Sequence, residues 1–280
     1  MTNILQAVHT IVSNDIPDVI DFYRSRNKIN AAGDALELFI KDVFANTVDK
    51  SIEKKQEQYE QVFSYTGNAN NPPDFMLFAG DAVEVKKIES QTGIALNSSY
   101  PMAKLRADSP MITRACKNCE PWTKKDLLYA VGSVKKKKLS LLWLVYGDCY
   151  AASSEVYQKM RNNIISGIEQ TVGVEFSPTK ELGRVNKVDP LGITSLRIRG
   201  MWQIEHPEKV YQYVMPKQQD RSSFRLAALM REAKYQSFPQ EDRAKLESIN
   251  NPNFENQQVK AKSPDNPVKR VAARLITYRI

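Results

Sequence analysis

Apolar residues recur at helical spacing in the first third of the chain. Residues 30–44 carry four apolar side chains at the i, i+3, i+4, i+7 spacing of a buried helix face: Leu36, Phe39, Ile40 and Val43. The very polar residues 49–61 are typical of a solvated helix end or loop. The Gly, Asn and Pro of residues 63–74 predict a loop that leads into the next elements.

From Asp74 onward the pattern is that of strands. The segments DFMLF (74–78) and AVEVKKI (82–88) flank Ala79-Gly80-Asp81, which predicts a hairpin turn. The nearly continuous apolar run at residues 139–147 predicts a central strand covered on both faces. A helix that starts at Ser153-Ser154 and ends at Gly173 is expected to cover this strand. Its apolar stripe would be Tyr157, Met160, Ile164 and Ile168.

The last third shows weaker patterns. Residues 195–202 (SLRIRGMW) alternate like a strand, and residues 225–235 (RLAALMREAKY) predict a short amphipathic helix. The Asn-, Pro- and Lys-rich residues 250–267 predict a loosely ordered tail, after which residues 268–280 are expected to dock a last element. We find no internal repeat and no clean linker, so the pattern predicts one domain of mixed α/β class.

Composition and charge narrow the class of protein. The chain is 42% hydrophobic and 26% charged, as in ordinary soluble proteins, and no uncharged apolar run is long enough to span a bilayer. The N-terminus lacks a secretory signal pattern, and three cysteines are too few for a disulfide framework. These features predict a cytoplasmic protein. The net charge of +8 favours an anionic partner such as nucleic acid, although mild basicity for solubility explains the charge alone equally well.

Two acidic residues and a lysine are expected to meet on the hairpin at residues 74–88. A turn near Gly80 places Asp74 across from Glu84 or its neighbour, and side chains alternate along a strand. Glu84 and Lys86 therefore share a face with Asp74, while Val83, Val85 and Lys87 point the other way. Two such carboxylates repel unless a cation lies between them, and their hard oxygen ligands suit Mg²⁺. The lysine could hold or activate a water or neutralise a phosphate.

A third acid, Glu37, lies beside the apolar face of the predicted helix at residues 30–44. Gly33, one turn away, leaves room near it, so Glu37 is a candidate outer metal ligand. Alone, a hairpin with alternating charges is more often a solvated face. The order of the parts favours the functional interpretation, because helix, loop, P-D, turn, E-x-K, buried strand and covering helix resemble the layout of the PD-(D/E)xK nuclease core.

Longer blocks carry a more specific resemblance. They are AGDALELFIKD (32–42), FSYTGN (63–68), NPPD (71–74), GDAVEVKKIES (80–90), LNSSYPMAKL (96–105) and KELGRVNKVDPLGITSLRIRGMW (180–202). Over most of its length the chain resembles the NgoPII family of type II restriction endonucleases. This resemblance implies Mg²⁺-dependent cleavage of double-stranded DNA at GGCC. It makes Asp74 and Glu84 metal ligands, Lys86 the catalytic lysine and Glu37 an accessory acid.

The resemblance also implies how the chain is divided into functional parts and which partners it has. We expect an N-terminal helical part at residues 1–62, a catalytic core at about 63–175, and a DNA-recognition and C-terminal part at about 176–280. Because GGCC reads identically on both strands, a two-fold homodimer is expected. A cognate DNA methyltransferase would protect host DNA. Two alternatives stay open: a structure-specific repair nuclease or junction resolvase with the same core, and a non-catalytic DNA-binding protein.

Several polar side chains are candidates for contacting DNA. Arg197 and Arg199 share one strand face and could read guanine, which arginine contacts most often in the major groove, or could simply face solvent. Asn97, Ser98 and Ser99 are candidates for contacting the DNA backbone near the phosphate that is cleaved. Further candidates, in the block just before the arginines, are Arg184, Asn186 and Lys187.

Two other motifs carry weaker signals. Cys116 and Cys119 form a C-x-x-C, but no second pair completes a zinc spacing, so ordinary cysteines near a loop are the better interpretation. The four lysines at 135–138 are typical of a solvated turn, with non-specific phosphate contact as an alternative.

Overall fold

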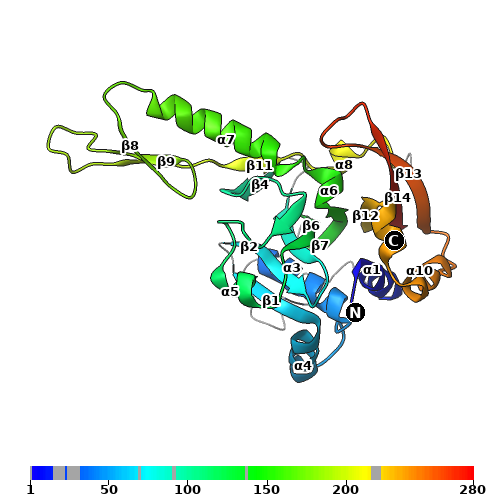
Figure 1. Cartoon of the computed structure of the whole chain (residues 1–280). Helices are drawn as coiled ribbons and strands as arrows, with labels where there is room; N and C mark the ends of the chain where they lie inside the picture. The colour runs from blue at the N-terminus through cyan, green and yellow to red at the C-terminus, as the bar shows by residue number, and fades with distance from the viewer. Residues whose placement is uncertain are drawn as a thin grey trace.

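A large mixed β-sheet organises the molecule (Figure 1). The structure is a computed structural model that describes residues 2–14, 23, 32–68, 71–89, 93–135, 138–215 and 222–280. Within these residues the main sheet runs β1-β2-β3-β6-β7-β12-β14-β13, with β5 paired to β6. β3–β6 and β7–β12 are parallel pairs, and the other neighbours along this path are antiparallel. The mixed α/β class is confirmed.

The described elements have the following bounds. The helices are α1 (Ile4–Ser13), α3 (Ala32–Ala45), α4 (Ile52–Val62), α5 (Arg114–Asn118), α6 (Gly147–Tyr150), α7 (Ser154–Glu169), α8 (Pro207–Val210), α9 (Glu232–Ser237) and α10 (Gln240–Glu247). The strands of the main sheet are β1 (Phe63–Asn68), β2 (Asn71–Leu77), β3 (Ala82–Ile88), β5 (Lys104–Arg106), β6 (Lys124–Lys135), β7 (Lys138–Tyr146), β12 (Arg225–Arg231), β13 (Phe254–Lys262) and β14 (Arg270–Arg279). The remaining strands are β4 (Ile94–Asn97), β8 (Glu175–Pro178), β9 (Gly183–Asn186), β10 (Leu196–Ile198) and β11 (Trp202–Ile204).

Strand β7 is buried on both faces, as the apolar run predicted. Leu142 and Leu144 belong to the hydrophobic core that the N-terminal helices cover, whereas Trp143 and Val145 belong to a second core on the opposite face. Side chains that alternate between two buried faces produce an uninterrupted apolar run rather than an alternating one. Helix α3 covers the first face, and residues of β4, α5, α6 and β11 contribute to the second.

Helix α3 carries Glu37 and is fixed to α4 by a buried carboxylate. Asp42 has no exposed surface, and it accepts hydrogen bonds from the hydroxyls of Thr47 and Tyr59, both at 2.6 Å. Lys55 of α4 pairs with the same carboxylate. A buried charge is tolerated when it is paired and fully hydrogen-bonded in this way. The helix predicted at residues 30–44 is confirmed from Ala32, and Asn30 and Ala31 lie outside the described residues.

The helix predicted after the central strand forms, but it does not cover that strand. None of the α7 residues is buried, and Met160 and Ile164 are 54% and 42% exposed. With the three-stranded sheet β10-β9-β8, α7 forms an arm (residues 154–200) that Figure 1 shows projecting away from the main sheet. An amphipathic stripe indicates that a helix has an apolar face, but it does not indicate which surface lies opposite that face.

The helix predicted at residues 225–235 is wrong for most of its length. Residues 225–231 form β12, which pairs in parallel with β7, and only Glu232–Ser237 are helical. Leu226 and Ala228 enter one core, while Ala227 and Leu229 enter the other. Burial on both faces therefore overrides the helix propensity of Leu, Ala and Met.

Three further predictions are corrected by strand pairing. Residues 63–68 and 71–74 are not a loop, because β1 and the start of β2 pair as antiparallel strands there. Residues 250–267 are not a loose tail, because β13 pairs along its whole length with β14, which is the expected last element. Residues 195–202 do not form one strand. They contain β10, which pairs with β9 in the arm, and the first residue of β11, which pairs with β4.

Candidate active site and DNA-binding cleft

The β2–β3 hairpin brings Asp74 and Glu84 face to face. Its register pairs Phe75 with Val83, and the next positions outward are Asp74 and Glu84. The backbone N–H of Val85 donates to Asp74 Oδ2 at 2.6 Å, which fixes the carboxylate against the neighbouring strand. Val83 is fully buried in the core. The hairpin turn predicted at residues 79–81 is confirmed.

Strand β1 lies very close to the backbone of β2 next to Asp74. At Gly67 of β1, a Cβ atom would lie 2.4 Å from the carbonyl oxygen of Pro73 and 3.0 Å from that of Asp74. Any side chain there would push β1 away from the residues that present Asp74. Gly67 is therefore a structural requirement of the site, and the sequence pattern did not reveal it.

Glu84 and Lys86 lie on the same face of β3 as expected. Lys86 Nζ is 2.6 Å from Glu84 Oε1, and the Glu84 side chain is 11% exposed. The second oxygen, Oε2, is buried with no hydrogen-bond partner among the described residues. A buried carboxylate oxygen without a partner is costly, so this atom is a candidate ligand atom for a cation.

Burial and neighbouring charges shift the pKa of Asp74 and of Lys86. Burial raises the pKa of Asp74 to about 7, and the negative charges of Glu84 and Glu37 add to the rise. Burial lowers the pKa of Lys86, but the carboxylate of Glu84, followed by that of Asp74, outweighs this effect and raises the pKa overall. Lys86 is therefore a cation at neutral pH, and the two acids share a site that favours added positive charge.

Lys87 and Glu37 lie at the edge of this cluster. Lys87 pairs with Glu89 and does not line the cleft, in agreement with its predicted opposite face. Glu37 pairs with Lys41 at 2.7 Å and does not line the cleft either, so its contribution at Asp74 is through its charge. A Cβ at Gly33 would meet no atom within 4 Å, so contacts do not require glycine there.

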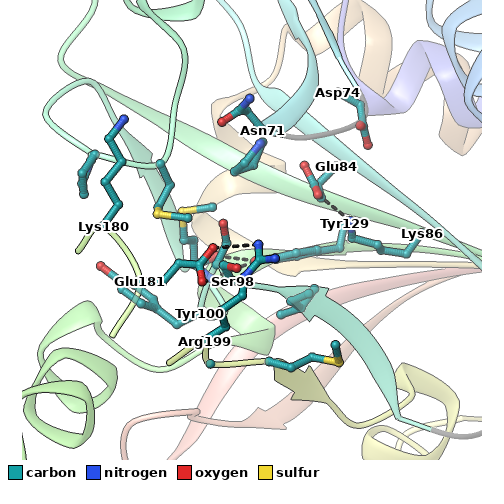
Figure 2. Close-up of a pocket in the computed structure, with 18 of the residues that line it drawn as sticks. Asn71, Asp74, Glu84, Lys86, Ser98, Tyr100, Tyr129, Lys180, Glu181 and Arg199 are labelled. Atoms are coloured by element: carbon teal, nitrogen blue, oxygen red, sulfur yellow. Dashed lines mark hydrogen bonds and ion pairs between the residues drawn. The ribbon is translucent and has the colours of Figure 1, made fainter. Parts of the chain in front are cut away.

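The cluster opens into a cleft of about 660 Å³ (Figure 2). Asn71, Asp74, Glu84, Lys86 and Tyr129 line one side. The segment after β4 and the base of the arm line the other, and the polar residues there are Ser98, Ser99, Tyr100, Lys180, Glu181, Arg197 and Arg199. Segments about 100 residues apart in the sequence therefore form one cavity, with two acids and Lys86 on one side and three cations and Glu181 on the other.

Comparison with known proteins assigns the chain to a family. Residues 2–262 match the model of the NgoPII restriction endonuclease family. The chain belongs to this family. The type II restriction enzyme NgoPII of Neisseria gonorrhoeae is 45% identical over 280 residues, which cover 99% of this chain and 100% of the relative. No solved structure matches the chain. The resemblance carried by the sequence blocks is thus confirmed, and the activity is that of a site-specific deoxyribonuclease acting on double-stranded DNA.

The carboxylates of the cleft are the side chains whose fit to a metal ion can be examined. Among the described residues, no group of three or more His, Cys, Asp or Glu side chains is arranged to hold a metal ion. The two opposed carboxylates with the unpartnered Glu84 oxygen nevertheless fit a divalent cation, since hard oxygen ligands supplemented by water suit such ions.

The DNA-contact candidates of this family member fall into two groups. Ser98, Ser99, Arg197 and Arg199 line the cleft. The other group does not line it: Asn186 donates to Ser177 Oγ at 2.7 Å, Lys187 pairs with Glu175 at 2.9 Å, and Arg184 is exposed on β9. The backbone of Asn97 ends β4 opposite Trp202. Sequence reasoning missed Tyr100, Tyr129, Lys180 and Glu181.

The three cysteines do not line the cleft. Cys116, Cys119 and Cys149 are free thiols, and Cys119 Sγ donates to the carbonyl of Cys116 at 3.1 Å. Lys136 and Lys137 lie outside the described residues. None of the described helices is both long enough and apolar enough to cross a membrane.

Proposed function

We propose that this restriction endonuclease hydrolyses DNA in the cleft with Mg²⁺ held by Asp74 and Glu84. Type II restriction endonucleases generally use divalent metal ions. The observation that carries the proposal is the buried Oε2 of Glu84, which has no partner among the described residues and faces a second carboxylate across the hairpin. Oxygen ligands of this kind are those that Mg²⁺ prefers.

Each residue of the cluster has a chemical role in this proposal. Bound Mg²⁺ supplies a Lewis acid that stabilises negative charge on the phosphate. Lys86, held by Glu84, places a positive charge where the phosphate enters and orients a water for in-line attack. Glu37 acts through its charge as an accessory acid, since its carboxylate is engaged with Lys41.

The finer features of the proposal follow from the family blocks and from the order of elements. We infer a PD-(D/E)xK core, supported by α3 packed on β3 and β6, the hairpin with the acids, and the buried β7. We infer GGCC as the site, a homodimer with one active site per strand, a cytoplasmic location and a methyltransferase that protects host DNA. A single domain is supported by the main sheet, which takes strands from both the 63–175 part and the 176–280 part.

Plasmid digestion tests the proposal directly. Wild-type protein with Mg²⁺ is expected to give discrete bands whose sequenced ends map to GGCC, and EDTA is expected to abolish them. Glu84→Gln should bind DNA but not cleave it. Cleavage by Glu84→Gln at the wild-type rate would contradict the metal site, whereas ends at another sequence would contradict GGCC alone. Cleavage only at junctions or distorted DNA would favour the structure-specific alternative.

A further inference from the structure

A nearly buried carboxylate holds the two arginines of the cleft together. Glu181 lies between β8 and β9, and its side chain is 9% exposed. It accepts from Arg199 Nε at 2.8 Å and from Arg199 Nη2 at 2.9 Å, and Arg197 Nη2 lies 3.4 Å from it. Figure 2 shows Glu181 and Arg199 together on the side of the cleft opposite Glu84 and Lys86.

This geometry fixes one edge of the Arg199 guanidinium and leaves the other unused. A guanidinium has five N–H donors in a rigid plane, and the fork to Glu181 takes Nε and one hydrogen of Nη2. Nη1 makes no hydrogen bond within the described residues. The side chains of Arg199 and Arg197 are 62% and 59% exposed, so the donors that Glu181 does not use are accessible from the cleft.

A carboxylate at this position is unfavourable for DNA affinity unless it has another use. Glu181 lines the cleft that we assign to the duplex, where its negative charge repels phosphates. Its hydrogen bond with Arg199 lowers the pKa of Glu181, so the repelling charge is present at neutral pH. Orienting a neighbouring guanidinium is a use that offsets this repulsion, because a flexible arginine loses less freedom on binding when it is already held.

We propose that Glu181 is a positioning residue for sequence recognition, which holds Arg199 and Arg197 so that their free N–H edges meet the paired acceptors of a guanine in the major groove. The guanine O6 and N7 atoms form the acceptor pair that an arginine fork matches best. This inference rests on the proposed function, because it requires duplex DNA in the cleft. It adds a residue that does not contact DNA itself but sets the discrimination between sites.

Binding measured without metal on two duplexes tests the inference. One duplex carries the site identified by the plasmid digest, and the other differs by one G·C pair. Glu181→Gln is expected to lower the ratio of the two affinities by about ten- to a hundredfold, since one arginine–guanine fork contributes that much discrimination. Its affinity for the altered duplex should stay equal or rise, because a repelling charge is lost.

Glu175→Gln is the matched control. Glu175 lies on the same arm and pairs with Lys187 at 2.9 Å, so the change in net charge is the same. This variant should keep the wild-type affinity ratio. Glu181→Asp, which retains the carboxylate, should recover part of the lost discrimination. A merely structural role for Glu181 would instead lower affinity for both duplexes together and would lower the melting temperature.

The outcomes separate the inference from the proposed function. Equal weakening on both duplexes would assign the arginines to phosphates and overturn the inference, as would an unchanged ratio. If Glu181→Gln fails to fold, Arg199→Lys replaces it: lysine keeps the charge but cannot form the fork, so discrimination should fall while affinity for the altered duplex holds. A retained ratio in Arg199→Lys would also overturn the inference. Wild-type protein that cannot distinguish the duplexes would contradict the proposed function first.

Discussion

Two adjacent lysines on β3 have opposite surroundings, which makes them a matched pair for mutation. Lys86 contacts Glu84 in the cleft, whereas Lys87 pairs with Glu89 outside it. Lys86→Ala is expected to lower the cleavage rate by about two to three orders of magnitude, the usual effect of removing one group that stabilises developing charge. DNA affinity should change little, because the benefit appears mainly in the transition state.

Single-turnover cleavage and metal-free binding, measured side by side, check this prediction. Lys87→Ala should retain nearly full activity. An essential Lys87 beside a dispensable Lys86 would mean that the catalytic face of β3 is the opposite one, and that Glu84 is not a metal ligand.

The buried His206 should make stability depend on pH. Its Nδ1 accepts from the backbone N–H of Glu208 at 3.1 Å, and its buried Nε2 has no partner among the described residues. Burial lowers its pKa against the opposing charges of Glu208 and Glu205. The unfolded chain therefore takes up the proton first as pH falls below about 6.5, and stability is lost in that range.

Urea unfolding at pH 7.5 and 5.5 measures this loss of stability. His206→Asn keeps an acceptor for the Glu208 N–H but does not titrate, so lowering the pH should cost the wild type more stability than it costs this variant. The raised pKa of Asp74 adds stability over the same pH range in both proteins, and its contribution cancels in this comparison. The chain has only one other histidine, His9, which is exposed on α1. His9→Asn should leave the wild-type pH dependence in place. An unchanged pH dependence in His206→Asn would contradict the assignment.

At the scale of elements, sequence reasoning succeeded where the pattern was local. The alternation of side chains along β3 correctly placed Glu84 and Lys86 on one face. The turn residues correctly predicted the hairpin, which sets Asp74 opposite Glu84. Sequence reasoning failed at β12. The apolar run of this segment is compatible with a helix as well as with a strand, and pairing with β7 makes it a strand. Glu181 was missed because nothing near it in sequence indicates that β10 and the residue after it will bring two arginines to it.

The β1–β2 pairing offers a test at this scale. Gly67→Ala would place a Cβ 2.4 Å from the backbone oxygen of Pro73, so β1 or β2 must shift. We expect a loss of about 1–3 kcal/mol in unfolding free energy, as for other overpacked sites, together with slower cleavage because Asp74 moves. Denaturant unfolding and plasmid cleavage measure the two effects.

A helical glycine gives the control for this substitution. A Cβ at Gly167 in α7 would meet no atom within 4 Å, so Gly167→Ala should leave cleavage unchanged and should gain up to about 1 kcal/mol from helix propensity. A Gly67→Ala protein as stable and active as the wild type would show that the strands separate without cost, and that Gly67 does not position Asp74.

At the scale of the whole molecule, carboxylates and cations of the cleft come from different parts of the fold. The net charge of +8 is consistent with a polyanionic substrate, but the main-sheet side of the cleft carries Asp74 and Glu84, the two carboxylates that we propose as metal ligands. The cations that face this side come from the base of the arm, whose helix α7 the sequence pattern had assigned to covering the central strand. We infer that the arm, by projecting from the main sheet, supplies the second side of the cleft that DNA enters.

This division predicts how DNA binding responds to salt. In EDTA, the logarithm of the binding constant should fall linearly with the logarithm of the salt concentration, because each phosphate contact releases counterions from the duplex. Lys180 lines the cleft from the arm, so Lys180→Ala should reduce that slope by about one. Lys245, which pairs with Glu241 on α10 at 2.8 Å, does not line the cleft, and Lys245→Ala should leave the slope unchanged. Fluorescence anisotropy across a salt series measures all three proteins. A flat response in the wild type would show that the positive charge is incidental to DNA binding, and equal slopes in both variants would place the phosphate contacts outside the cleft.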